Sequence, residues 1–120
     1  MSRLRADREP DWFNARTPGT LPGLLGVRVT GVAQGRASGE LAVRSELFAP
    51  NGYLHAGTVV TLADTLAGYA CLAHLPEGAS GFTTIELKSN HVGTALDRTL
   101  VAELSAAHPG RTTQVWDATV

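Results

Sequence analysis

The stretch LHAGTVVTLADTLAGYACLAHLP, residues 54–76, decides the fold because it predicts one long apolar helix. Its apolar residues go right round the helical wheel instead of forming a single stripe, so both sides of the helix need a cover. A sheet that curls round the helix or a second subunit could supply it. Asp64 is the only charged residue of the stretch. A lone carboxylate there is either a chance surface residue or a functional group, because burying an unpaired charge is costly.

The segments on either side set the limits of this helix. The turn residues Ala49-Pro50-Asn51-Gly52 lead the chain to His55, where we expect the helix to begin. Pro76 and two glycines that follow it predict an end near Leu75.

Alternating apolar and polar residues predict strands before and after the helix. Residues 24–48 read as a β-hairpin that is broken at Gly35. Three more strand candidates follow the helix, at 82–92, 98–108 and 111–120. The order ββαβββ with short connections predicts an α+β fold in which an antiparallel sheet packs on one helix.

Length and composition restrict the class of protein. The 120 residues predict one domain, and a net charge of −1 without blocks of like charge argues against a nucleic-acid surface. The single cysteine, Cys71, excludes an internal disulfide framework and a cysteine-rich zinc site. No metal cluster is visible in the sequence.

The N-terminal residues predict a tail rather than a targeting segment. They alternate in charge and lack the apolar run of a signal peptide, so we expect a soluble cytoplasmic protein with no membrane partner. Residues 1–10 are expected to be frayed, and 11–16 to form a short helix that stops at Thr17-Pro18-Gly19. We therefore divide the chain into a tail, 1–19, and a domain, 20–120.

The segment NGYLHAGTVVTLADTLAG resembles the signature of hotdog-fold acyl-CoA thioesterases of the phenylacetate-degradation type, within the 4-hydroxybenzoyl-CoA thioesterase superfamily. That signature reads Leu-His-Gly-Gly with an acid nine residues after the histidine, the interval from His55 to Asp64. The later stretches TIELKSNHV and AAHPGRTTQVW look like the family's later strands, so the likeness covers about residues 20–120.

This resemblance implies a curved antiparallel sheet wrapped around the central helix, and a dimer or tetramer of identical chains. Each active site would lie between subunits, with the histidine loop from one chain and the acid from the other. Family members normally continue through a turn into a final strand, and this sequence stops at Val120, so that strand is apparently missing.

The resemblance also implies catalytic roles. Asp64 would attack the thioester carbonyl or deprotonate water, and the two alternatives stay open. The backbone N–H of Ala56, where the family has glycine, would polarise the carbonyl at the helix N-terminus. His55 would organise the loop or hydrogen-bond near the carbonyl. Asn51 would substitute for the family's amide residue at the position of Ala49, unless it is simply a turn residue.

A hydroxyl group orients the water in relatives. It lies either four residues after the acid, where this chain has Gly68, or on the neighbouring strand, where Thr84 matches and Thr83 is the fallback. The small residues Ala67 and Gly68 leave room for an acyl group one turn beyond Asp64, and Tyr69 and Leu72 could line its far end.

Coenzyme A is expected as part of the substrate, and no separate cofactor is predicted. The residues assigned to substrate binding are Gly57, Ala67, Gly68, Lys88, Ser89, Asn90, His91 and Arg111. Residues of the last five types are more often solvated surface residues, and that alternative stays open.

Two other functions compete with acyl-CoA hydrolysis. A hotdog dehydratase or hydratase pairs a histidine with an acid, but generally in a different turn pattern. Alternatively, the departures at Ala49 and Ala56 leave a hotdog protein that binds acyl-CoA without hydrolysing it.

Overall fold

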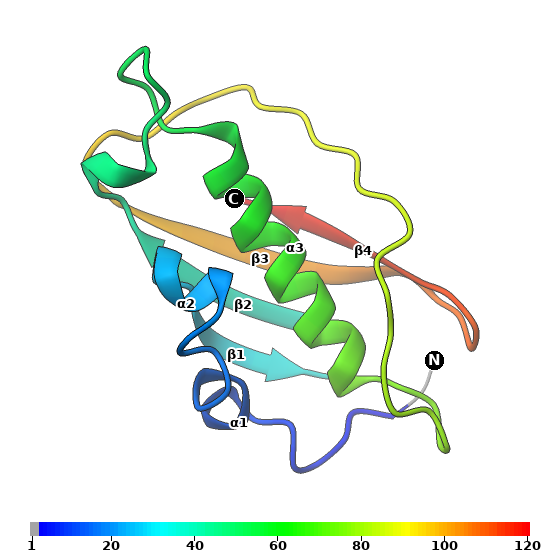
Figure 1. Ribbon diagram of the computed structural model, residues 1–120. Coiled ribbons are helices and arrows are strands. Elements are labelled where there is room, and N and C mark those ends of the chain that lie inside the picture. Colours follow the sequence, from blue (N-terminus) through cyan, green and yellow to red (C-terminus); the bar gives the residue numbers. More distant parts are fainter. Residues whose placement is uncertain (1–2) are drawn as a thin grey trace.

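The computed structural model describes residues 3–120, which form a four-stranded antiparallel sheet with one long helix across one face (Figure 1). The strands lie in the order β1-β2-β3-β4. The elements are α1 (Pro10–Asn14), α2 (Leu21–Leu25), β1 (Arg28–Ala33), β2 (Arg36–Ala42), the 3₁₀ helix η1 (Ser45–Leu47), α3 (Ala56–Ala73), β3 (Thr99–Pro109) and β4 (Gln114–Thr119). The predicted α+β class is confirmed.

The core lies between α3 and the sheet. Leu62, Leu66 and Ala70 of α3 follow one another at intervals of four residues and are fully buried. They face buried residues of the strands, among them Leu41 and Ala102. Length and composition alone would let α3 cross a membrane, but its buried stripe identifies it as the core helix of this domain.

The limits of α3 agree with the prediction to within two residues. His55 is the N-cap, with extended backbone angles (φ −67°, ψ 133°), and His74 is the C-cap. The hairpin of β1 and β2 also lies within its predicted range, but the predicted start is wrong, because residues 21–25 form α2. Pro22 in the first turn and Gly26 at the C-cap favour this short helix over a strand.

The predicted strand 82–92 is wrong for this structure. Residues 82–92 run beside α3 without pairing with any strand, and most of this segment is exposed (Figure 1). Alternating residues make a segment able to form a strand, but ladder hydrogen bonds need a neighbouring strand. Within residues 3–120, β4 pairs only with β3, so the sheet has four strands instead of five.

The N-terminal residues pack on the domain instead of fraying. The Arg5 backbone N–H donates to Ala73 O (2.9 Å) at the end of α3, and its guanidinium donates to Ala79 O (2.8 Å) in the loop that follows. Phe13 of α1 is fully buried, and Asn14 exchanges two hydrogen bonds with the Val29 backbone. Met1 and Ser2, which belong to the predicted frayed tail, lie outside the described residues.

His74 joins three parts of the fold at the end of α3. Its fully buried ring accepts a hydrogen bond from the Gly35 N–H at Nε2 (2.9 Å), and its Nδ1 lies 2.7 Å from Ala70 O. A carbonyl can only accept, so Nδ1 donates and the ring is held as one neutral tautomer. The Gln114 amide donates to His74 O (3.1 Å), which ties β4 to the same corner.

Replacing His74 tests this role. His74→Phe keeps a ring against Trp116 but leaves the Gly35 N–H and the Ala70 carbonyl without this partner. We expect the free energy of unfolding in urea to fall by about 1–3 kcal/mol. The control His108→Phe, at an exposed position, should change it by less than about 0.5 kcal/mol. Equal stability of the two variants would contradict the role assigned to His74.

Candidate functional site

The first turn of α3 is fixed by its own cap and by the preceding chain. The Gly57 N–H donates to His55 Nδ1 (2.7 Å), so a neutral His55 ring carries its proton on Nε2. The His55 N–H and the Thr58 hydroxyl both donate to Leu47 O (3.0 and 2.9 Å). His55 therefore organises the loop, and its exposed Nε2–H remains available as a donor to a ligand.

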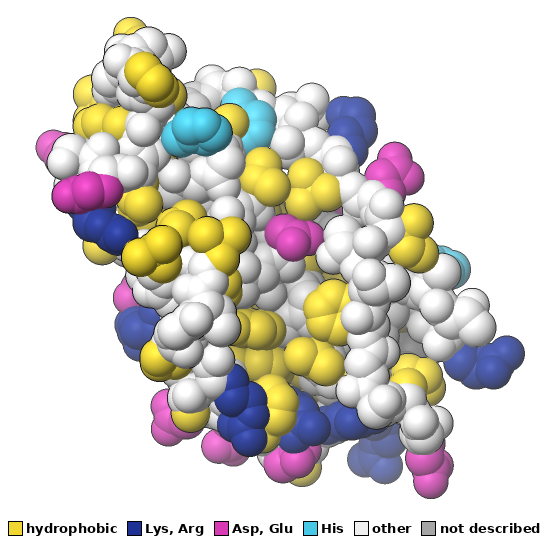
Figure 2. Space-filling model, in the orientation of Figure 1, with side chains coloured by type: hydrophobic (Ala, Val, Ile, Leu, Met, Phe, Trp, Pro, Cys, Tyr) yellow, Lys and Arg dark blue, Asp and Glu magenta, His cyan; other side chains and the backbone are white. Residues whose placement is uncertain are grey.

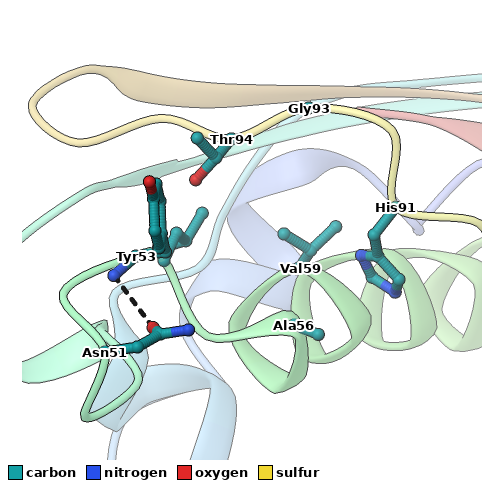
Figure 3. A pocket seen from close by; sticks show the side chains of 8 residues that line it. Asn51, Tyr53, Ala56, Val59, His91, Gly93 and Thr94 are labelled. Atoms are coloured by element: carbon teal, nitrogen blue, oxygen red, sulfur yellow. Dashed lines mark hydrogen bonds between the residues drawn. The ribbon is translucent and has the colours of Figure 1, made fainter.

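The Ala56 N–H has no hydrogen-bond acceptor among the described residues. It lies beside a cavity of about 240 Å³ between the loop before α3 and residues 91–94 (Figure 3). Asn51 lies on the same wall, and its Oδ1 accepts a hydrogen bond from the Tyr53 N–H (3.2 Å). Asn51 is thus a turn residue, and its amide also lines the cavity. The lining residues are Asn51, Tyr53, Leu54, Ala56, Val59, His91, Gly93 and Thr94.

A larger open groove, of about 1330 Å³, runs along the face of α3 that the sheet does not cover. Its walls are α3, the unpaired segment 82–95 and β4. Figure 2 shows apolar side chains gathered along this hollow. The groove holds the predicted residues Asp64, Ala67, Gly68 and Thr84.

Asp64 and Thr84 meet in this groove. The Thr84 hydroxyl donates to Asp64 Oδ1 across 3.4 Å, a long and weak hydrogen bond. The structure thus brings together the acid and the hydroxyl that the sequence predicts, from a helix and from a segment 20 residues away. Asp64 is half-buried in the single chain rather than enclosed in a dry slot.

The space expected beside Ala67 and Gly68 is filled in part by Phe82. The tip of its ring would lie 2.7 Å from a Cβ built on Gly68, so the missing side chain is what admits the ring. Tyr69 lies elsewhere, because its ring stacks on Phe13 (4.8 Å) and its hydroxyl contacts Thr17 Oγ1 (2.9 Å). Neither Tyr69 nor Leu72 lines the groove, so their predicted role is wrong.

Cys71 lies in the groove two turns beyond Asp64. Burial raises the pKa of its thiol above the usual value, so the neutral form is favoured. Cys71, Phe82 and Tyr53 line these cavities although no motif in the sequence predicts a site role for them. The spacing from Asp64 to Cys71, seven residues along one helix face, is the signal that could have placed the cysteine.

The five polar residues predicted to bind coenzyme A, Lys88, Ser89, Asn90, His91 and Arg111, all line the large groove in the single chain. Lys88 Nζ contacts Asn90 Oδ1 (3.3 Å) and Ser89 Oγ contacts His91 Nε2 (3.0 Å), all on the exposed segment. His91 also lines the smaller cavity at the first turns of α3, whereas Arg111 lies in the turn before β4. Gly57 lines neither cavity and lies under the His55 ring.

Metal ligands are not grouped in the described part of the chain. Among residues 3–120, no three histidine, cysteine, aspartate or glutamate side chains come close enough to hold an ion.

Residues 51–120 match the thioesterase superfamily. The chain belongs to this family. It is 30% identical over 93 residues to the 1,4-dihydroxy-2-naphthoyl-CoA hydrolase of Listeria monocytogenes, covering 78% of this chain and 75% of the relative. The enzyme of the same name from Escherichia coli is 30% identical over 107 residues, covering 87% of this chain and 76% of the relative.

Solved structures of relatives confirm the hotdog fold. A variant of the thioesterase PA1618 from Pseudomonas aeruginosa superposes with a TM-score of 0.90 at 29% identity, over 98% of this chain and 84% of that one. A thioesterase family protein from Silicibacter pomeroyi superposes with a TM-score of 0.80 at 32% identity, over 94% of this chain and 80% of that one. The site lies on the one long helix of this fold.

Gly57 permits the cap of α3, and this can be tested. A Cβ at this position would lie 2.8 Å from His55 Nδ1, so Gly57→Ala should displace the ring and break its hydrogen bond. We expect a loss of about 1 kcal/mol in the free energy of unfolding, measured in urea. Gly81→Ala is the matched control, because nothing lies within 4 Å of a Cβ there. An unchanged stability in Gly57→Ala would show that the cap does not hold the helix.

Proposed function

We propose that this protein hydrolyses acyl-CoA thioesters and that Asp64 is its catalytic carboxylate. The observation that carries the proposal is the meeting of Asp64 and Thr84 in an open groove of the thioesterase-family helix. Asp64 is the only charged residue between His55 and Pro76, so its position is not that of an ordinary solvated helix face.

The groups of this site support a simple reaction. Asp64 removes a proton from water or attacks the thioester carbonyl itself, and the carbonyl oxygen becomes negative. A backbone N–H at a helix N-terminus stabilises that charge, and Ala56 offers one. When the C–S bond breaks, the thiolate takes up a proton and leaves as coenzyme A, and the net reaction consumes one water. Thr84 orients the water or the carboxylate.

One chain cannot supply the whole site. Ala56 and Asp64 are eight residues apart, which is about 12 Å along an α-helix axis. A carbonyl group that accepts from the N–H at about 3 Å cannot also contact that carboxylate. A site that uses both groups therefore takes the helix N-terminus from one chain and Asp64 from a second, so we propose a dimer or a tetramer. The half-exposed groove beside Asp64 leaves room for that second chain.

An aromatic or hydroxylated acyl group is the substrate class we propose. The apolar groove suits the acyl group, and the names of two relatives specify a hydroxylated aromatic acyl-CoA. The Lys88–His91 segment and Arg111 are the proposed contacts to coenzyme A. Acyl-CoA occurs inside cells, which agrees with the cytoplasmic location predicted from the sequence.

Replacing the carboxylate tests the proposed reaction. Asp64→Asn keeps the shape of the side chain and removes its charge, so kcat for the best substrate should fall about 1000-fold. The oligomer should persist and acyl-CoA should still bind. Asp97→Asn, the same change at an exposed position outside the groove, is the control and should keep its activity. Activity of Asp64→Asn within a few-fold of the parent would rule Asp64 out.

The parent chain is assayed first on a panel of acyl-CoAs by release of free thiol. Turnover supports hydrolysis. Saturable binding without turnover would favour the binding protein, and hydration of an enoyl-CoA would favour the hydratase.

Mixing two inactive variants tests whether the site is shared. Ala56→Pro removes only the N–H, since proline fits the first helical position and His55 already has the extended backbone that precedes proline. When Ala56→Pro and Asp64→Asn chains are unfolded, mixed in equal amounts and refolded, half of the dimers are mixed, and each mixed dimer contains one intact site. About one quarter of the parent activity should return. If both groups act within one chain, mixing restores none.

A further inference from the structure

Phe82 lies across the groove one helical turn beyond Asp64. Its ring points end-on at Gly68, so that the ring atom Cζ would be 2.7 Å from a Cβ at that position and the neighbouring ring carbons 3.3 and 3.6 Å away. Gly68 is buried, whereas Phe82 is 44% exposed. The ring therefore stands in the groove with its tip on the helix backbone.

The extended backbone explains why Phe82 and Thr84 face the same helix. Alternate side chains of an extended segment point the same way, and residues four apart on a helix share one face. Thr84 contacts Asp64, and Phe82 contacts Gly68. The two segment residues are two positions apart, and their two partners on α3 are four positions apart. The Phe82 ring therefore lies one helical turn from the carboxylate of Asp64 along α3.

Phe82 divides the length of the groove. From Asp64 to Gly68 the helix rises about 6 Å, which accommodates a single aromatic ring or a short chain. Beyond the ring the groove continues past Cys71 to Leu75 and Pro76, about another 10 Å along the axis. A long acyl chain that starts at Asp64 would have to displace Phe82 to enter this farther part.

We propose that Phe82 determines acyl-group size by closing the acyl compartment at Gly68. The proposal rests on the proposed function, since it takes Asp64 as the place of the thioester carbonyl. The preferred substrates are then acyl groups of one aromatic ring or a short aliphatic chain. Phe82 keeps longer acyl chains out of the farther part of the groove, which Cys71 and Leu75 line.

The test compares phenylacetyl-CoA, hexanoyl-CoA and decanoyl-CoA. In Phe82→Ala, the kcat/KM for decanoyl-CoA relative to phenylacetyl-CoA should rise at least about tenfold, because the farther groove opens to the chain. Leu24→Ala is the matched control. It removes a large apolar side chain, 71% exposed, that does not line the groove. That control should leave the ratio unchanged.

A double-mutant cycle separates a direct contact from general damage. Gly68→Ala should push the ring aside in the parent chain and alter the chain-length ratio. In the Phe82→Ala background the added methyl group meets no ring, so the same change should have little effect. Equal effects of Gly68→Ala in both backgrounds would contradict the proposal, as would an unchanged ratio in Phe82→Ala.

Binding measurements keep this test independent of turnover. If the parent chain releases thiol from none of the acyl-CoAs, the proposed function fails. Calorimetric titration of the three acyl-CoAs into Asp64→Asn, with and without Phe82→Ala, then gives the size preference directly. A preference for decanoyl-CoA that appears only with Phe82→Ala supports the proposal, and equal affinities in both forms overturn it.

Discussion

The packing of α3 against the sheet is the interaction on which the rest of the structure depends. A helix that is apolar on every side gains most by burying one stripe, and here Leu62, Leu66 and Ala70 take that place with no exposed surface. This fixes the rotation of the helix. Asp64 and Gly68, which lie between members of the buried stripe in sequence, are turned to the opposite side and line the groove.

Hydrogen bonds hold both ends of α3, and so they fix the position of the groove that runs along this helix. At the N-terminus, Leu47 O accepts from His55 and Thr58, and His55 in turn caps Gly57. At the C-terminus, His74 holds the β1–β2 turn through Gly35. Asp64, the proposed catalytic carboxylate, lies between these two points on a helix rather than on a loop, which favours precise placement of its side chain.

Much of the fold can be predicted from the sequence because the signals are local. The limits of α3 follow from the turn at Pro50, the cap at His55 and the break at Pro76, and the hairpin follows from alternation around Gly35. The predictions that are wrong concern segments whose structure depends on residues far away in the chain. Whether residues 82–92 form a strand depends on a neighbour in space, and burial of Phe13 depends on contacts far along the chain. Neither can be read from a periodic pattern.

The candidate site also has features that the sequence predicts and features that only the fold shows. The resemblance to the family predicts a site role for Asp64, nine residues after His55, and a hydroxyl at Thr84, and both side chains lie together in the groove. The obstruction at Gly68 could not be predicted, since a glycine in a sequence indicates open space as readily as a close neighbour, and only the fold shows that Phe82 fills it. A small residue beside a catalytic acid therefore defines a pocket only together with the side chain that faces it. In this chain the facing residue lies 14 positions downstream, on a segment that runs beside α3 without pairing with the sheet.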